Sequence, residues 1–380
     1  MSSYCSQKFW WLTIEPERRQ LQSCCAAYPH KIDTTWLKDN PGNLFNIPIL
    51  TQERKDMLEG KQVASCEATC WAPERQGKSS RRLVMESDKV THTDITTEPE
   101  VLHINLGSDC NLTCVYCTKQ YSTAWLRDIA SNGPYLFENR YNINANDLVL
   151  LKLGQKKIDQ TESYNLLIDE IVKYKNYKFV SITGGEPFLN NSLTKLLKNF
   201  TNPVRLYTGL GVNTDRLERI LADIGDNVEF VVSAEGLNDI YEFVRWNNSY
   251  ERFIRNLELL QKAGKVSFSS VLSNLTIFNF KEFEDKYGDY YIDMVFCNEP
   301  DYLALNVLDD ASKDRLQSVQ FKNKDHFIKQ SLQTPCTKDQ HSNLQIFLKK
   351  FVERRRLDLS VYPSSFVDWL NEPIDLTVTN

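Results

Sequence analysis

The sequence has no long apolar run and no signal-peptide pattern. No apolar run approaches the ~18 residues that a membrane-spanning helix requires. The first residues lack the basic start and apolar core of a secretory signal. With a net charge of −5, the chain also lacks the basic excess of a protein with a large nucleic-acid footprint. We therefore expect a cytoplasmic protein with no membrane association and no nucleic-acid partner.

The chain is large enough for a sizeable core and is rich in cysteine. It has 380 residues, of which 41% are hydrophobic, enough for one large domain and a smaller module. Without a secretory signal, its 10 cysteines are expected to stay reduced and available as metal ligands.

Three of the cysteines, Cys110, Cys114 and Cys117, lie in one short segment at positions i, i+4 and i+7. The segment follows a strand-like run at residues 101–106. Three thiolates in one loop can hold three irons of a cubane iron–sulfur cluster and leave the fourth iron without a protein ligand. An open position suits a catalytic site, whereas a structural site is closed. Taken alone, the spacing also fits a zinc site.

A second motif follows a run that begins at Phe179 and reads as a buried strand. The run ends in Thr183, Gly184, Gly185, Glu186 and Pro187. Two glycines, an acid and a proline after a strand make a sharp turn in which the backbone can approach a ligand closely. The alternative interpretation is an ordinary tight turn between a strand and a helix.

In this order, the cysteine triplet and the Gly-Gly-Glu-Pro turn resemble the signature of the radical S-adenosylmethionine (SAM) enzymes. The resemblance implies that Cys110, Cys114 and Cys117 ligate a [4Fe-4S] cluster, whose open iron binds SAM and delivers one electron to break its C5′–S bond. It implies that residues 183–187 receive the amino group of SAM. It also implies a 5′-deoxyadenosyl radical that abstracts hydrogen from a substrate, and a flavodoxin- or ferredoxin-type reductant.

The surrounding pattern predicts the fold. Six strand-like runs occur at residues 101–106, 179–183, 204–207, 228–233, 266–272 and 291–296. Helical patterns between them include residues 164–175, 214–224 and 250–263. Alternating strands and helices predict a parallel sheet with right-handed crossovers. Six repeats predict an α/β fold of the partial (β/α)6 TIM-like barrel type, with chemistry at the C-terminal ends of the strands.

Polar residues at other strand ends are further candidates. Ser233 and Glu235 close the fourth strand, and Arg245 follows on the next helix. The family resemblance implies that Ser233 and Glu235 contact the ribose of SAM and that Arg245 lies near its carboxylate, which suits an arginine fork. The alternative is that Arg245 pairs with a helix carboxylate on the surface. Asn213, after a glycine-rich bend, is a weaker candidate because Asn is common in turns.

The fate of the substrate radical would decide the reaction. Cys297 directly follows the sixth strand and is a candidate hydrogen-atom donor for an epimerisation. The alternative is a buried structural cysteine. An auxiliary cluster would instead permit oxidation or cross-linking of the substrate.

The N-terminal region carries five cysteines among several tryptophans: Cys5, Cys24, Cys25, Cys66 and Cys70. Such clustering without a secretory signal predicts metal ligation rather than disulfides. The order resembles the auxiliary-cluster (SPASM or twitch) module of radical SAM enzymes, in the subgroup where the module precedes the barrel. Shared features are a Cys-Cys pair, a Trp-containing helix and the helix Lys55-Asp-Met-Leu-Glu-Gly60.

One feature departs from that subgroup. Its last cysteine pair is usually Cys-x-x-Cys, whereas Cys66 and Cys70 are separated by three residues. One helical turn still brings such residues together. The resemblance implies a second, auxiliary iron–sulfur cluster with either Cys24 or Cys25 as a ligand. A zinc site of four thiolates is the alternative.

These patterns divide the chain into three predicted parts. Residues 1–88 form the cysteine-rich module, residues 89–310 the barrel, and residues 311–380 a helical extension without assigned chemistry. The expected substrate is a peptide or another polar molecule, with a sugar, nucleoside or small metabolite as alternatives. A non-catalytic zinc or iron–sulfur scaffold is the competing hypothesis, which does not account for the Gly184–Pro187 turn.

Overall fold

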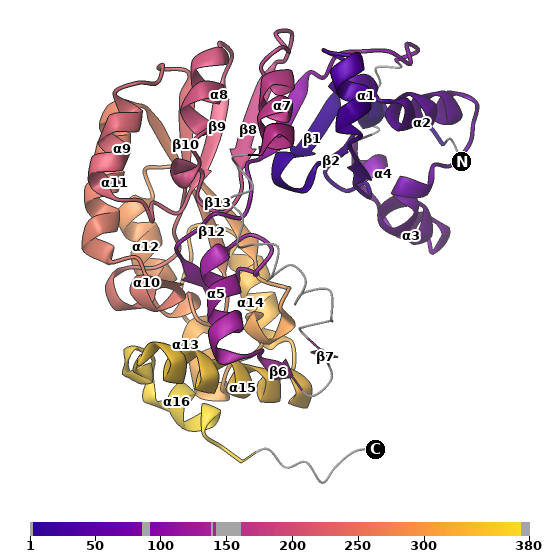
Figure 1. The fold of residues 1–380 in the computed structure, drawn as a ribbon. Helices are drawn as coiled ribbons and strands as arrows, with labels where there is room; N and C mark the ends of the chain where they lie inside the picture. Colours follow the sequence, from indigo (N-terminus) through magenta and orange to yellow (C-terminus); the bar gives the residue numbers. More distant parts are fainter. Residues whose placement is uncertain (1–2, 86–91, 138–139, 142–160, 374–380) are drawn as a thin grey trace. The chain divides into compact units, whose positions relative to one another are not determined.

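The computed structural model describes residues 3–85, 92–137, 140–141 and 161–373 (Figure 1). The chain forms two compact units. Unit 1 contains Met1–Asp109, Lys157–Tyr207 and Arg216–Phe230, and unit 2 contains Cys110–Lys156, Thr208–Asp215 and Val231–Asn380. The predicted boundary between residues 88 and 89 lies outside the described residues, so the domain limits remain predictions.

Unit 1 is built on a mixed sheet with the strand order β9-β8-β4-β1-β2-β3. Its strands are β1 (Trp11–Glu15), β2 (Gln20–Gln22), β3 (His30–Lys31), β4 (Val101–Asn105), β8 (Phe179–Thr183) and β9 (Val204–Thr208). Strands β1, β4, β8 and β9 run parallel, whereas β2 and β3 are antiparallel additions. The pairing of β1 with β4 was not predicted, and it makes the N-terminal region part of this sheet.

The sequence of each strand explains its place in the sheet. Strand β8 is buried at three successive residues, as expected for a parallel strand covered on both faces. Strand β4 alternates between buried and half-buried residues. The polar Ser181 is tolerated in β8 as a small residue that is itself buried.

Unit 2 contains β12 (Lys265–Leu272), β13 (Ile292–Phe296) and the second half of β10 (Val228–Ser233), which the unit boundary divides after Phe230. Strand β12 lies between β10 and β13, and β12 and β13 are parallel. A separate two-stranded sheet joins β5 (Thr113–Cys114) to β11 (Arg245–Trp246), and β6 (Leu136–Phe137) pairs with β7 (Arg140–Tyr141). All six predicted strands are present, and the predicted α/β class with a parallel sheet is confirmed.

Helices follow the strands as predicted. They include α7 (Glu162–Ile171), α8 (Leu193–Asn199), α9 (Thr214–Leu221), α10 (Asn238–Val244), α11 (Tyr250–Ala263) and α12 (Phe280–Tyr287). Helix α7 begins earlier than predicted because Thr161 Oγ1 accepts a hydrogen bond from the Tyr164 N–H and caps the helix. Helix α11 begins at a Ser249 cap and ends before Gly264, at the limits that were predicted.

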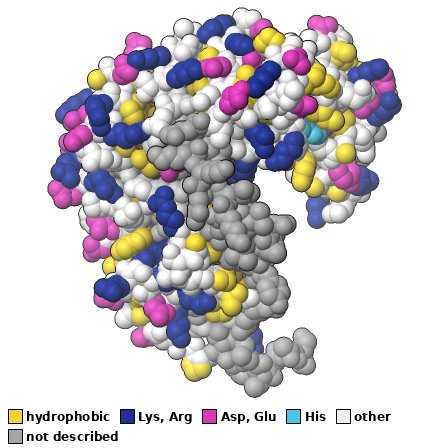
Figure 2. All heavy atoms as spheres, viewed as in Figure 1, with side chains coloured by type: hydrophobic (Ala, Val, Ile, Leu, Met, Phe, Trp, Pro, Cys, Tyr) yellow, Lys and Arg dark blue, Asp and Glu magenta, His cyan; other side chains and the backbone are white. Residues whose placement is uncertain are grey.

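The C-terminal part is helical, as expected, and contains α13 (Asp310–Gln317), α14 (Asp325–Gln333), α15 (Lys338–Arg355) and α16 (Ser364–Leu370). The N-terminal region adds the helices α1 (Thr34–Asp39), α2 (Pro48–Leu58), α3 (Ala72–Arg75) and α4 (Arg81–Met85). In the described part of the chain, no helix has the length and apolar character needed to cross a membrane. On the face that Figure 2 shows, basic and acidic side chains are interspersed.

A buried arginine ties the N-terminal region together. Arg54, in α2, is fully buried and donates to the carbonyl oxygens of Lys8 at 3.0 Å, Phe45 at 2.6 Å and Ile95 at 2.6 Å. It also donates to Asn46 Oδ1 at 3.0 Å. Burial lowers the pKa of Arg54 to about 10, which leaves it charged at neutral pH. The Arg54 side chain therefore connects four separate positions of the N-terminal region by hydrogen bonds.

We predict that Arg54→Ala destabilises the protein by on the order of 3 kcal/mol, because three carbonyl oxygens and one amide oxygen lose a hydrogen bond from a charged donor. The free energy of urea-induced unfolding measures this effect. Lys55→Ala is the control, since Lys55 is exposed and reaches Glu59 only at 4.0 Å. Its expected effect is within about 0.5 kcal/mol. Equal effects of the two substitutions would contradict the role of Arg54.

Candidate active site

The three cysteines of the predicted cluster loop pack together in unit 2. Cys110 and Cys114 are each 8% exposed and form one buried cluster with Leu112, against which Tyr116 and Cys117 pack. The loop thus brings together the three thiols that the sequence singled out. The sulfur atoms make separate hydrogen bonds: Cys110 Sγ accepts from the Leu112 N–H at 3.5 Å, and Cys117 Sγ donates to the Thr118 carbonyl at 3.7 Å.

Several elements of unit 2 hold this loop in place. Strand β5 pairs with β11, so that Cys114 lies opposite Arg245 in the register. The indole N–H of Trp125, in α5 (Thr123–Asn132), donates to the Cys114 carbonyl at 2.9 Å. Arg355, at the end of α15, donates through Nε to Thr113 Oγ1 at 3.1 Å and lies over the Trp125 ring. The C-terminal helices, to which the sequence assigned no role, therefore buttress the cysteine loop.

A buried triad lies next to Cys114. Arg245 donates through Nε and Nη2 to the two carboxylate oxygens of Glu235, at 3.0 and 2.7 Å. The Tyr116 hydroxyl donates to Glu235 Oε1 at 2.5 Å. Glu235 is fully buried and Arg245 is 3% exposed. Such a bidentate pair is favourable because it satisfies both charges inside the protein.

Two expectations for Arg245 are wrong, namely its place on a helix and the alternative of a surface ion pair, whereas its predicted role toward SAM stays a prediction. It lies on strand β11 rather than on a helix, and its carboxylate partner is the buried Glu235 rather than a surface side chain. Its remaining nitrogen, Nη1, approaches Cys114 Sγ at 3.8 Å. Burial raises the pKa of the Cys114 thiol to about 12, and the charge of Arg245 opposes this shift. A cationic group thus lies beside the buried thiol of Cys114.

The second motif lies in unit 1, where the backbone of two loops comes into close contact. Gly185 N–H donates to the Gly107 carbonyl at 2.7 Å, and Glu186 N–H donates to the Asp109 carbonyl at 2.8 Å. Gly184 has φ +139°, and a Cβ there would lie 2.9 Å from the Gly107 oxygen. Only glycine fits at that position. The close contact between the two loops therefore requires glycine at position 184.

The side chains of this turn are also engaged. Thr183 Oγ1 and His103 Nε2 are 3.0 Å apart, and burial lowers the pKa of His103. Glu186 is 2% exposed, and its Oε1 accepts from the Phe188 N–H as the cap of η7 (Pro187–Leu189). Pro187 is the first residue of that 3₁₀-helix, a position that does not require an N–H group.

The remaining predicted residues lie at strand ends in unit 2. Asn213 is exposed, and its Oδ1 accepts from the Asp215 N–H at the start of α9. Ser233 is half-buried at the end of β10. Cys297 follows β13, as predicted, and is 5% exposed, with a pKa raised to about 12 by burial. It lines a cavity of about 180 Å³ together with Asn298, Leu305 and Thr334, among others.

Four of the five N-terminal cysteines are buried in unit 1. Cys5, Cys66 and Cys70 share one apolar cluster with Met57, Val63 and Trp71. Cys24 is 6% exposed and donates to Gln7 Oε1 at 3.1 Å. Burial, with contributions from the nearby Cys24 and Cys66, raises the pKa of Cys5 to about 12. Cys24 therefore lies close to the cluster that contains Cys5 and Cys66.

Cys24 and Cys25 have different surroundings. Cys24 is buried, whereas Cys25 is exposed. A hydrogen bond from Cys25 lowers the pKa of Cys24 to about 6. The buried Lys8 lies nearby and binds Glu53 Oε2 at 2.7 Å and Ser65 Oγ at 2.8 Å. The structure thus distinguishes Cys24 from Cys25 by burial, whereas the sequence offered both equally as metal ligands.

Among the residues that the structure describes, no group of three or more His, Cys, Asp and Glu side chains has an arrangement that would hold a metal ion. The donor chemistry of both cysteine groups nevertheless fits an iron–sulfur cluster or zinc, since both metals take thiolate ligands. Buried thiols with raised pKa values become thiolates only when a positive charge replaces the proton.

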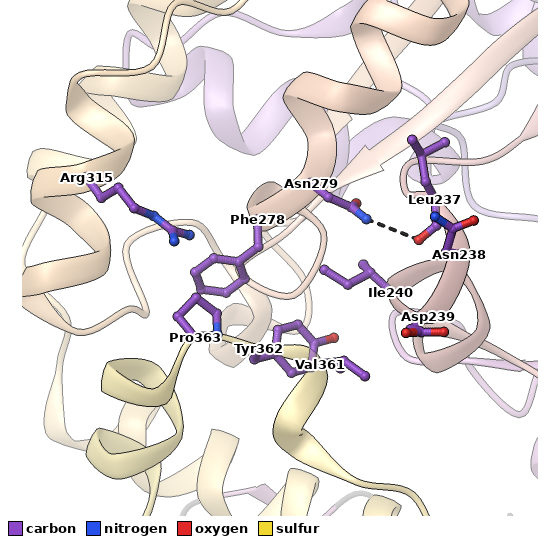
Figure 3. A pocket seen from close by; sticks show the side chains of 10 residues that line it. All are labelled: Leu237, Asn238, Asp239, Ile240, Phe278, Asn279, Arg315, Val361, Tyr362 and Pro363. Atoms are coloured by element: carbon purple, nitrogen blue, oxygen red, sulfur yellow. Dashed lines mark hydrogen bonds between the residues drawn. The ribbon is translucent and has the colours of Figure 1, made fainter.

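A larger cavity of about 450 Å³ lies elsewhere in unit 2 (Figure 3). It is lined by the start of α10, by Phe278 and Asn279 of η8 (Ile277–Asn279), by Arg315 and by residues 361–363. None of the residues predicted for catalysis or cofactor binding lines it. Its position nevertheless follows the C-terminal ends of β10 and β12, where a barrel enzyme binds substrate.

Comparisons with known proteins place this site in a family. Residues 104–287, which include the cysteine loop and the Gly184–Pro187 turn, match the Radical SAM superfamily. GTP 3′,8-cyclase of Synechocystis sp. (strain ATCC 27184 / PCC 6803 / Kazusa) is 25% identical over 175 residues. The match covers 45% of this chain and 45% of the cyclase, so the chain spans less than half the length of that relative.

Solved structures give weaker likenesses. Native anSMEcpe with bound AdoMet is 15% identical, with a TM-score of 0.34 over 67% of this chain and 59% of that chain. Streptococcus suis SuiB bound to the precursor peptide SuiA is 14% identical, with a TM-score of 0.32 over 93% of this chain and 71% of that chain. From the match over residues 104–287 and the motifs within it, we conclude that this part of the chain resembles the radical SAM superfamily.

Proposed function

We propose that this protein is a radical SAM enzyme that cleaves SAM and abstracts hydrogen from a peptide or another polar substrate. The observation that carries the proposal is the packing of the half-buried Cys117 against the buried Cys110 and Cys114 inside the matched region. When bound there, a [4Fe-4S] cluster supplies the electron that splits the C5′–S bond of SAM. The protein contributes binding, orientation and electrostatics.

In this proposal, the three cysteines hold the cluster, and residues 183–187 with Ser233 and Asn213 serve SAM binding. The fixed backbone of the Gly184–Gly185 turn supports its role, because preorganised donors and acceptors bind without an ordering cost. Arg245 commits two nitrogens to Glu235 and directs the third toward Cys114. We therefore assign Arg245 and Glu235 to the electrostatics of the cysteine loop, in addition to the contacts with SAM that the family resemblance implies.

We propose that Cys5, Cys24, Cys66 and Cys70 form a second metal site, and that this site holds an auxiliary iron–sulfur cluster. Their common burial and the proximity of Cys24 to Cys5 support this set of ligands. Zinc bound by four thiolates is the alternative, and metal analysis distinguishes them. In an oxidation or cross-linking, the auxiliary cluster would accept an electron from the substrate radical. In an epimerisation, Cys297 would instead donate a hydrogen atom to the substrate radical.

The electron source in this proposal is a flavodoxin- or ferredoxin-type reductant. The substrate class includes peptides, and the cyclase relative makes a nucleotide-like small molecule an alternative. The cavity beside Phe278 and Arg315 offers an apolar wall and a cation to either class.

We predict that Cys114→Ala abolishes formation of 5′-deoxyadenosine from SAM, because a ligand of the catalytic cluster is lost. The assay uses anaerobically reconstituted protein, dithionite and chromatography of the nucleoside product. Cys336→Ala is the matched control, since Cys336 lies outside the cysteine groups and is half-exposed. Wild-type product formation by the Cys114 variant would contradict the assignment.

We predict that Cys24→Ala lowers the metal content of the N-terminal site, whereas Cys25→Ala leaves it unchanged. The reason is that only Cys24 is buried near Cys5 and Cys66. Iron, sulfide and zinc per chain are measured for both variants after identical reconstitution. A greater loss in the Cys25 variant would reverse the assignment, and zinc in place of iron would favour the alternative metal.

A further inference from the structure

Behind the Gly184–Gly185 turn lies a carboxylate from the N-terminal region. Glu17, in η2 (Pro16–Arg18), accepts a hydrogen bond from the Ser108 N–H at 2.5 Å and another from Ser108 Oγ at 2.9 Å. Its carboxylate also lies against Gly107, where a Cβ would come within 2.7 Å of Glu17 Oε2. All of these residues belong to unit 1. The carboxylate thus occupies the space that a side chain at position 107 would need.

The opposite side of the same segment contacts the turn. The Gly107 and Asp109 carbonyl oxygens accept from the N–H groups of Gly185 and Glu186, at 2.7 and 2.8 Å. Residues 107–109 therefore form a layer of backbone between the Glu17 carboxylate and the turn. Gly107 has no side chain, so the Glu17 carboxylate can lie close to it, and Gly184 has none, so the turn can lie close to Gly107.

The position of Glu17 follows from strand register. Ile14 of β1 lies opposite Ile104 of the parallel strand β4. Three residues after this pair, just beyond the ends of both strands, the chain reaches Glu17 after β1 and Gly107 after β4. The pairing of β1 with β4 thus delivers the carboxylate to the segment that precedes Cys110.

We propose that Glu17 is a positioning residue for SAM binding, acting through residues 107–109 on the backbone of Gly185 and Glu186. That the ligand is SAM rests on the proposed function. The contacts of Glu17 with Ser108, and of Gly107 and Asp109 with the turn, do not depend on it. A hydrogen bond to a charged acceptor is stronger than a neutral one, and loss of Glu17 removes this acceptor from the two donors of the half-buried Ser108. Loss of Glu17 should therefore loosen the turn without removing any ligand of the cluster.

Glu17→Ala tests this proposal in the full chain, reconstituted with iron under anaerobic conditions. We expect the Kd for SAM, from equilibrium dialysis, to rise about tenfold, which corresponds to 1.4 kcal/mol. Iron content and kcat at saturating SAM should stay at their wild-type values while KM for SAM rises. Ser108→Ala, which removes only one of the two donors, should raise Kd about threefold.

Hydrogen exchange gives a second readout that does not depend on SAM. In Glu17→Ala, the amides of Gly185 and Glu186 should exchange faster, whereas the amides of the core of β9 should not change. Glu15→Ala is the matched control, because Glu15 is a half-buried acid of the same segment whose carboxylate pairs with Arg18 at 3.0 Å rather than with Ser108. Its Kd and exchange pattern should match those of the wild type.

The outcomes separate this proposal from the proposed function. A wild-type protein that fails to bind or cleave SAM would overturn the proposed radical SAM function. Hydrogen exchange at Gly185 and Glu186 would still test whether Glu17 holds the turn in place. Wild-type Kd and wild-type exchange in Glu17→Ala would overturn the role of Glu17. If that variant does not fold, Glu17→Gln decides by the same measurements, since it keeps the size of the side chain and one acceptor oxygen.

Discussion

The close approach of backbone to backbone at the ends of β4 and β8 is the constraint on which unit 1 depends. Gly184 and Gly107 meet at distances that no side chain allows, and hydrogen bonds from Gly185 and Glu186 lock the contact. This contact requires β4 and β8 to be parallel and in register, which the pairing of Asn105 with Thr183 provides. The position of the turn that we propose for SAM binding thus follows directly from the sheet.

Unit 2 faces a different constraint, which is the burial of charge. Glu235 and Arg245 are removed from water, and each is tolerated because it satisfies the other. The pair also fixes Tyr116, which lies within the cysteine loop, and directs a guanidinium nitrogen toward Cys114. The antiparallel pairing of β5 with β11 brings these groups together. Short strands of two residues are sufficient here because Trp125 and Arg355 add contacts from outside the sheet.

Much of this could be predicted from the sequence. The six strands of the β/α repeats were found because buried parallel strands read as apolar runs, and the two motifs were found because their residue types have few other uses. The pairing of β1 with β4 was missed, since partners distant in sequence leave no local pattern. Arg355 was missed for the same reason: its contact with Thr113 spans most of the chain. Arg245 was recognised, but its partner Glu235 was assigned to another role because spacing alone does not show which side chains meet.

The decisive measurement is anaerobic reconstitution, with iron counting and an assay for 5′-deoxyadenosine from SAM and dithionite. We predict SAM cleavage with about eight iron atoms per chain, as two cubane clusters would contain. Cleavage with about four would retain the catalytic site and leave the N-terminal cysteines to zinc or to free thiols. A colourless protein that binds no iron and yields no 5′-deoxyadenosine would contradict the central claim.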